Sequence, residues 1–184
     1  DIPMQHISDR VLKSMNRRGD GELIRQRVTK IRAMFPDAVI RTSLIVGFPG
    51  ETEEEFTELY RFLDEYKLER AGVFAYSREE GSVAAEMPDQ IEETVKQQRL
   101  QTLLDLQDAV MDQFSQTLVD SVQTVLCCGY DEDHELYFGR TYMDSPEVDG
   151  IVYFYSEEEV AEGTFVQVKI ESGVGAELYG EITE

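Results

Sequence analysis

The sequence contains few of the residues that build disulfide frameworks and metal cages. Its 184 residues include two cysteines, Cys127 and Cys128, which are adjacent, and two histidines, His6 and His134, which lie far apart. Adjacent cysteines cannot easily bridge to each other or supply a metal cage. We therefore expect no disulfide scaffold in this chain and no metal site built from its own cysteines or histidines.

The sequence also lacks long apolar segments. No apolar run approaches the roughly 18 residues needed to span a bilayer, although 41% of the residues are hydrophobic, enough for a folded core. The first residues, DIPMQHISDR, include neither an initiator Met nor the basic and apolar regions of a secretion signal. We expect a cytoplasmic protein without a membrane partner, and a chain that is part of a longer protein.

Basic residues are scarce in the last third of the chain. From Ser115 onward, sixteen Asp and Glu residues face two basic residues, Arg140 and Lys169, which gives −14. The formal net charge of the whole chain is −21, so residues 1–114 carry −21 + 14 = −7. Such an acidic surface repels a phosphate backbone and attracts basic proteins. Simple solubility is the alternative explanation for this charge.

The first part of the chain alternates between helical and β-rich patterns. Ser8 precedes a helical pattern, a second helix is expected over residues 22–35, and β-branched residues predict a buried strand over 39–47. Thr52 and Glu55 form a capping box before a third helix, and residues 71–77 read as another strand. Alternation of this kind is typical of βαβ units in a parallel sheet or barrel.

Each predicted strand in this part is followed by a polar or glycine-rich loop. The loops are QHIS (5–8), GFPGE (47–51) and YSREEGS (76–82). The C-terminal ends of parallel strands meet at one edge and face the ligand together. GFPGE lacks the lysine of a Walker-type phosphate loop, so the pattern gives no support for a phosphate site.

After residue 90 the sequence pattern becomes helical and then, after residue 114, β-rich. A long amphipathic helix is expected over residues 91–114 and reads as a structural connector. After it, five short β-rich runs separated by glycine, proline and acidic turns predict a small closed antiparallel barrel. The expected organisation is an α/β domain over 1–90, a connecting helix over 91–114 and an all-β barrel over 115–184.

Five segments together resemble the radical S-adenosylmethionine (radical SAM) methylthiotransferases. They are, in the family's order, DIPMQHISDRVLKSMNRR (1–18), IVGFPGETEEEF (45–56), FAYSREEGSVAAEM (74–87), KQQRLQTLLDLQ (96–107) and GRTYMDSPEVDG (139–150). The resemblance implies the C-terminal half of a six-stranded, partial (β/α) barrel. It also implies that the small β-barrel is an OB-like TRAM domain.

The segment Pro3 to Ser8 resembles the branch of this family that modifies a ribosomal protein rather than tRNA. That branch adds a methylthio group to the β-carbon of an aspartate in small-subunit ribosomal protein twelve. A barrel with a charge of −14 is suited to a basic ribosomal protein and ill suited to tRNA, so charge favours the same branch independently. The alternatives are a tRNA methylthiotransferase of the same family and a non-enzymatic, acidic binding module.

The resemblance also implies cofactors that this chain cannot hold by itself. The family uses S-adenosylmethionine and two [4Fe-4S] clusters, the first held by a Cys-x-x-x-Cys-x-x-Cys motif, and the cofactors carry the difficult chemistry. That motif and the cysteines for the second cluster do not occur here. We expect their ligands to precede Asp1 in the parent enzyme, and we expect this chain alone to be inactive, with no catalytic or metal-binding residue of its own.

The family motif nonetheless predicts binding residues in this chain. Those expected at S-adenosylmethionine are Ile45, Val46, Gly47, Phe48, Tyr76 and Ser77. Glycine permits a close backbone approach to a ligand, although a turn made only for geometry is the alternative for Gly47. Gln5, His6 and Arg17 are the candidates for the substrate side of the pocket. A structural His6 and a solvent-facing Arg17 remain the alternatives, and the protein is expected to be a monomer.

Overall fold

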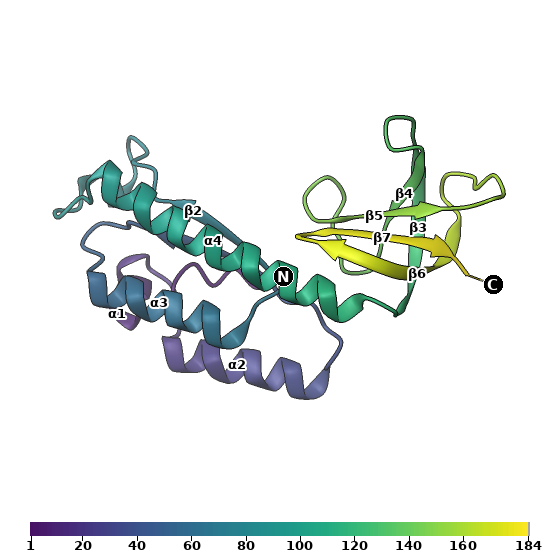
Figure 1. Cartoon of the computed structure of the whole chain (residues 1–184). Coiled ribbons are helices and arrows are strands. Elements are labelled where there is room, and N and C mark those ends of the chain that lie inside the picture. The colour runs from purple at the N-terminus through teal and green to yellow at the C-terminus, as the bar shows by residue number, and fades with distance from the viewer. Residues whose placement is uncertain (184) are drawn as a thin grey trace. The chain divides into compact units, whose positions relative to one another are not determined.

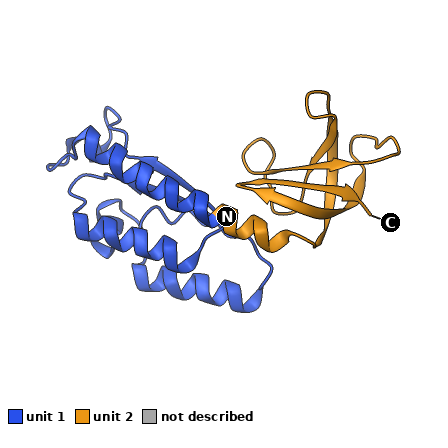
Figure 2. Ribbon diagram, in the orientation of Figure 1, with its two compact units in different colours: residues 1–110 blue, residues 111–184 orange. Residues whose placement is uncertain are grey.

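The computed structural model describes residues 1–183, which form two compact units, residues 1–110 and residues 111 onward (Figure 2). The first unit contains α1 (Asp9–Ser14), α2 (Gly21–Met34), β1 (Arg41–Val46), α3 (Glu53–Tyr66), β2 (Arg70–Ala75), a 3-10 turn η1 (Val83–Glu86) and most of α4 (Glu93–Leu118). No helix in the described part of the chain is long and apolar enough to cross a membrane.

Three extended segments run parallel in the first unit. β1 pairs with β2 in register from Arg41 opposite Arg70 to Val46 opposite Ala75. On the other side of β1, the segment before α1 pairs through Gln5, which forms a parallel bridge with Leu44. The predicted parallel arrangement of three strand ends is therefore confirmed, and Figure 1 shows the helices that connect them.

Side-chain caps begin the helices of the first unit where the sequence predicts them. The Ser8 side chain accepts a hydrogen bond from Val11 N at the start of α1. At the start of α3, the Thr52 hydroxyl accepts from Glu55 N while the Glu55 carboxylate accepts from Thr52 N at 2.8 Å, which is the predicted capping box. Such caps satisfy backbone N–H groups that have no partner inside the helix.

One face of the parallel sheet carries the core of the first unit. Alternate residues of β1 are buried, and Leu44 and Val46 pack with residues of α2, α3 and α4 such as Val28, Phe62 and Leu103. The alternate residues on the other face are more exposed, and Phe74 of β2 is 58% exposed. Because side chains alternate along a strand, the sheet has one face covered by helices and a second face that is more exposed in the described part of the chain.

The second unit is a closed five-stranded barrel. Its strands are β3 (Val122–Asp131), β4 (Leu136–Arg140), β5 (Ile151–Tyr155), β6 (Phe165–Val174) and β7 (Glu177–Ile182), in the order β3-β4-β5-β7-β6 around the barrel. The predicted closed barrel is confirmed. One pairing departs from the expected antiparallel pattern, because β5 and β7 run parallel. An odd number of strands cannot alternate in direction around a closed ring, so one parallel pair is required.

Alternate residues from the strands fill the interior of this barrel. Phe154 is fully buried at its centre, and it packs with the other inward-facing side chains, Val125, Cys127, Val152, Val168, Ile170 and Leu178. Cys127 belongs to this core, whereas Cys128 is half-buried. Both cysteines are free. Hydrophobic burial of this interior is the main source of stability for a barrel this small.

Replacing Phe154 by alanine should destabilise the barrel by about 3–5 kcal/mol, because it leaves a cavity at the centre of the core. Phe165→Ala is the matched control, since Phe165 is 69% exposed and should change the free energy of unfolding by less than about 0.5 kcal/mol. Urea unfolding of the whole chain, followed by circular dichroism, measures both. Equal effects of the two substitutions would contradict this description of the core.

Candidate functional site

The candidate site lies at the edge where the three parallel segments of the first unit end. Ile45 N donates to Gln5 O at 2.8 Å, and Tyr76 N donates to Val46 O at 2.8 Å, so the backbone links all three ends directly. The rings of Phe48 and Tyr76 meet edge to face with centroids 5.3 Å apart. Residues separated by more than 70 positions in the sequence are thus brought to one edge.

The turn after β1 has a fixed conformation that depends on two glycines. Gly47 and Gly50 adopt φ angles of 72° and 76°, in the left-handed region that other residues rarely occupy. Glu51 N donates to Phe48 O at 2.9 Å, which closes the turn. Gly50 N donates to Asp89 O at 2.8 Å and so fixes the turn to the loop before α4.

A buried carboxylate holds this turn from inside. Oε2 of Glu51 accepts hydrogen bonds from Gly47 N and from Phe48 N, the second at 3.1 Å. Arg99 of α4 donates to Oε1 of Glu51 at 3.2 Å, and the two side chains are 8% and 0% exposed. Breaking a buried ion pair of this kind strands a charge, so the geometry of the turn is coupled to the position of α4.

Burial controls the protonation of Glu51. Desolvation raises the pKa of Glu51 to about 7, and the nearby Arg99 and the two backbone amides offset part of that rise. The carboxylate remains the form that satisfies all its donors, since a protonated oxygen has fewer acceptor sites. The ionised form therefore makes the most contacts in the turn, but at a desolvation cost, and that cost is what raises the pKa of Glu51.

Lys96 of α4 packs directly against Gly47. A Cβ atom built on Gly47 would lie 2.4 Å from Lys96 Cγ, so the lysine stem occupies the space that a side chain at Gly47 would need. The Lys96 ammonium then reaches the ring of Tyr76, with Nζ 5.4 Å from the ring centroid. Gly47 therefore makes a close approach between β1 and α4 possible, while its backbone remains part of the edge.

The end of the first segment carries a second polar cluster. His6 is fully buried, and its Nδ1 accepts a hydrogen bond from Ser8 N at 3.0 Å. Ser8 Oγ donates to Glu55 Oε1 at 2.9 Å, and Arg10 Nε donates to the same oxygen at 2.7 Å. This chain of contacts connects the end of the first segment to the N-terminus of α3.

Burial and charge shift two groups in this cluster in opposite senses. Burial, with a contribution from Arg10 and Arg99, lowers the pKa of His6 to about 4, against a raising effect of Glu55. Burial acts to raise the pKa of Glu55, but hydrogen bonds from Arg10, Thr52 and Ser8 outweigh it and lower the value to about 2. At neutral pH, His6 is therefore a neutral imidazole beside an ionised Glu55.

The structure places the expected cofactor-binding residues in different environments. The side chain of Val46 is fully buried in the helix-covered core, so only the backbone of Val46 is available to a ligand at the edge. Ile45 lies half-buried on the opposite face of β1, in register with Phe74 of β2. Ser77 Oγ donates to Glu79 Oε1 at 2.7 Å. The Tyr76 hydroxyl is buried and has no hydrogen-bond partner among the described residues.

The expected substrate-side residues also differ from one another. Gln5 is half-buried and has a φ of 70°, an unusual backbone conformation for this residue type. Arg17 is exposed, and its guanidinium donates to the carbonyl oxygen of Pro3, so it lies beside the first segment. His6 is buried beneath that segment, and its Nε2 has no partner among the described residues.

The contacts of Lys96 and Arg99 with the turn after β1 were not predicted from the sequence. A signal was present in the helix pattern. Lys96, Arg99, Leu103, Gln107 and Val110 are spaced three, four, four and three residues apart, so they share one helical face, and all five are buried. Lys96 and Arg99 share this face with Leu103 and Val110, which belong to the buried side of the helix. Charged side chains on a buried face need polar partners from other parts of the fold.

The described residues do not fit an iron–sulfur cluster, because they contain no group of three His, Cys, Asp or Glu side chains able to hold a metal ion. They do fit part of an adenosine-containing ligand. The buried Tyr76 hydroxyl has no hydrogen-bond partner among the described residues, and Ile45 and Phe74 form an apolar strand surface.

Comparison with known proteins defines the class to which these units belong. Residues 1–63 match the Radical SAM superfamily, and residues 116–183 match the TRAM domain. The chain therefore carries part of a radical SAM domain followed by a TRAM domain, and the resemblance drawn from its motifs is confirmed.

Particular relatives share nearly the whole chain. It is 45% identical over 99% of its length to the ribosomal protein uS12 methylthiotransferase RimO of Alkaliphilus oremlandii. It is 44% and 46% identical, over 99% of its length, to the RimO proteins of Acetivibrio thermocellus and Geotalea uraniireducens. The chain spans 40–42% of the length of these three relatives.

Replacing Arg99 by methionine should cost about 3–5 kcal/mol of folding free energy, because it leaves the buried Glu51 carboxylate without its counterion. Arg27→Met is the matched control on α2, where the arginine is exposed and should contribute less than about 0.5 kcal/mol. Urea unfolding at neutral pH measures both variants. A loss at Arg99 no larger than the loss at Arg27 would show that the ion pair does not hold the turn.

The low pKa of His6 predicts a pH dependence with a definite sign. The unfolded state binds a proton at His6 below about pH 6.5 while the folded state does so below about pH 4, so this contribution to stability is lost as the pH falls through that window. The contribution of Glu51 to the pH dependence of stability has the opposite sign. Because its pKa is raised, stability from this group increases as the pH falls from about 7 to 4.5. The comparison of wild type with His6→Gln isolates the histidine.

Unfolding free energies of these two proteins, measured from pH 7 to pH 4, provide the test. The advantage of wild type over His6→Gln should shrink on acidification by an amount on the order of 1–3 kcal/mol. A constant difference across this range would mean that His6 titrates normally and is not buried as described.

Proposed function

We propose that this chain is the C-terminal part of a radical SAM methylthiotransferase that modifies ribosomal protein uS12. The observation that carries the proposal is the identity of 44–46% to the three RimO proteins, which extends over 99% of the chain and so includes both units. An identity of this size across both units supports a shared role for the pair rather than for one domain alone. Without the cysteine motif, the chain by itself should be inactive.

In this proposal the edge of the first unit forms part of the S-adenosylmethionine site. The backbone of Val46, Gly47 and Phe48 and the side chain of Ile45 contact the adenosine, with Tyr76 and Ser77 at the end of β2. The Tyr76 hydroxyl supplies a hydrogen bond that has no partner in the described residues. When bound beside a reduced cluster, S-adenosylmethionine supplies the one-electron chemistry needed to break an unactivated C–H bond.

Gln5, His6 and Arg17 serve the substrate side of the same edge. Gln5 and Arg17 present polar atoms beside the first segment, and a guanidinium is well suited to orient a carboxylate such as that of an aspartate. His6 is buried and does not contact the substrate in this scheme. The hydrogen bond that its Nδ1 accepts from Ser8 N fixes the backbone just after Gln5. His6 is therefore a positioning residue.

The TRAM barrel serves as the binding surface for the basic ribosomal protein. With −14 over residues 115–184, it attracts a basic partner and repels tRNA. The two alternatives from the sequence, a tRNA methylthiotransferase and a non-enzymatic acidic module, make different predictions for the same assay.

The assay uses this chain joined to an N-terminal segment that carries the three-cysteine motif of its relatives, with clusters reconstituted. Incubation with S-adenosylmethionine, a reductant, a sulfur source and uS12 should replace one hydrogen of an aspartate by a methylthio group, detected by mass spectrometry. The 184-residue chain alone is the negative control. Modification of tRNA instead of uS12, or cofactor cleavage with neither product, would reject the proposed substrate, and an intact cluster without cofactor cleavage would favour a binding module.

The Tyr76 contact has its own test. Tyr76→Phe removes the hydroxyl but keeps the ring, and it should weaken S-adenosylmethionine binding by the same joined protein about tenfold, the value of one hydrogen bond. Tyr60→Phe is the matched control, because Tyr60 packs against the core from α3. Calorimetric titration measures both. Unchanged affinity in Tyr76→Phe would remove Tyr76 from the proposed site.

A further inference from the structure

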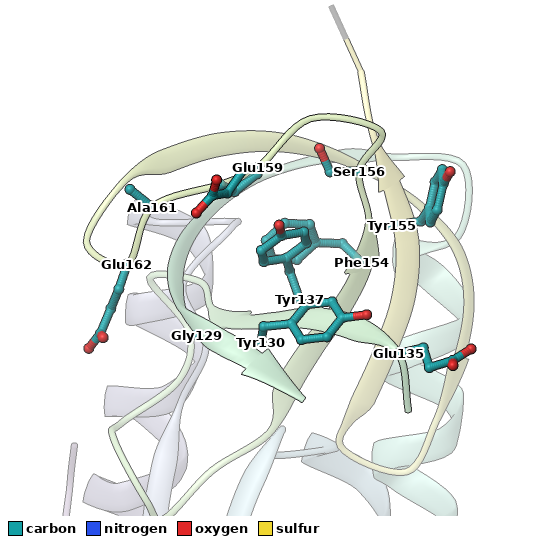
Figure 3. Close-up of a pocket in the computed structure, with 11 residues that line it drawn as sticks. Gly129, Tyr130, Glu135, Tyr137, Phe154, Tyr155, Ser156, Glu159, Ala161 and Glu162 are labelled. Carbon is teal, nitrogen blue, oxygen red and sulfur yellow. The ribbon is translucent and has the colours of Figure 1, made fainter. Parts of the chain in front are cut away.

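One end of the β-barrel contains a pocket that the strand-end site does not explain. Its volume is about 600 Å³, and it is lined by β3, β4, β5 and the loop between β5 and β6. Figure 3 shows aromatic side chains around and below its opening, with three glutamates, Glu135, Glu159 and Glu162, at its margin. The pocket therefore combines aromatic rings with carboxylates, and a ligand must suit both.

The aromatic rings form a graded series from the surface to the core. Tyr130, which is 50% exposed, meets Tyr137 edge to face with centroids 5.0 Å apart. Tyr137 in turn stacks on Phe154 at 5.7 Å, and Phe154 is fully buried. Tyr155, which is 54% exposed, lies on another side of the opening (Figure 3). Tyr130 therefore presents exposed ring surface next to Tyr137, which is itself stacked on the barrel core.

The backbone around the pocket is well fixed. A β-bulge between Cys127 and Gly129 interrupts the pairing of β3 with β4 just before Tyr130. The far end of the β5–β6 loop is tied to β3, since Cys127 N donates to Thr164 O at 2.9 Å and Gly163 N donates to Cys127 O at 2.8 Å. These two bonds hold the loop against β3, so this side of the pocket is preformed, which lowers the cost of binding.

The charges of the pocket have no counterion within it. The residues that line it include three glutamates and neither lysine nor arginine. The two basic residues after Ser115, Arg140 and Lys169, are both absent from the lining, and Lys169 lies 3.8 Å from Asp120. An anionic or purely apolar guest would leave these carboxylates uncompensated.

A second acidic hollow, of about 740 Å³, lies against the same loop. It shares Ser156 and Glu159 with the first pocket and adds Glu157, Glu158 and Glu181. The loop after β5 therefore borders two acidic hollows. A partner with more than one cationic side chain along an extended segment matches this arrangement better than a small molecule does.

We propose that the pocket between Tyr130, Tyr137, Tyr155 and the three glutamates receives an arginine side chain of a basic polypeptide. A guanidinium is planar, so it stacks on a tyrosine ring, and its N–H groups reach carboxylates in the same plane. Lysine offers a point charge without that plane. This inference rests on the proposed function, because a basic ribosomal protein is the partner proposed there, and it assigns the place where one of its arginines binds.

The test measures binding of the whole 184-residue chain to three probes: a short peptide of alternating arginine and glycine, a matched peptide of lysine and glycine, and a single-stranded RNA of similar length. Fluorescence anisotropy at low and moderate salt should rank arginine peptide above lysine peptide, with no detectable RNA binding. Equal binding of the two peptides would overturn the assignment to a guanidinium. Tighter binding of the RNA would overturn the proposal as a whole.

Matched variants locate the site on the barrel. Glu159→Gln should weaken binding of the arginine peptide about three- to tenfold more than Glu171→Gln, which removes the same charge from an exposed position of β6 outside both hollows. Equal losses would mean that diffuse charge, rather than this pocket, binds the peptide.

The exposed ring provides a second, independent readout. Tyr130→Leu should weaken binding of the arginine peptide about three- to tenfold, whereas Tyr130→Phe should retain most of the affinity, because the ring face is what stacks on the guanidinium. No loss with leucine would overturn the stacking contact. These binding measurements need neither clusters nor activity, so failure of the proposed methylthiolation and failure of the arginine pocket give distinguishable results.

Discussion

The buried carboxylate of Glu51 is the interaction on which the candidate site depends. It holds the Gly47 and Phe48 amides on one side and Arg99 on the other, and it precedes the Thr52 cap of α3 by one residue. A single side chain thus ties the turn after β1 to α4, one residue before the N-cap of α3. Because Phe48 contacts the Tyr76 ring, the end of β2 is positioned through the same turn.

Local patterns in the sequence predicted local structure well. The Ser8 cap, the Thr52–Glu55 capping box, the parallel strands and the closed barrel follow from short-range spacing and were all confirmed. The Glu51–Arg99 pair was not foreseen, because its members are 48 residues apart and only the fold brings them together. The parallel pairing of β5 with β7 was missed for a similar reason, since it follows from ring closure and not from either strand.

The two units differ in the chemistry of their surfaces, and the proposed functions differ accordingly. In the first, the apolar side chains of Ile45 and Phe74 and the Tyr76 hydroxyl, which has no partner among the described residues, adjoin a fixed turn, and this suits a cofactor with an aromatic base. In the second, a pocket lined by tyrosines and three glutamates, with neither lysine nor arginine among its described lining residues, suits a cationic polypeptide. In the proposed enzyme, the first unit would contact the cofactor and the second would contact the protein substrate.

In the proposed enzyme, the edge held by Glu51 is a wall of the S-adenosylmethionine site. Amide hydrogen exchange of the joined, cluster-containing protein tests it most directly, with and without S-adenosylmethionine. With the cofactor bound, we expect slower exchange in peptides that cover residues 45–52 and 74–78, and unchanged exchange in α2. Unchanged exchange at residues 45–52 and 74–78, in a protein that binds the cofactor, would contradict it.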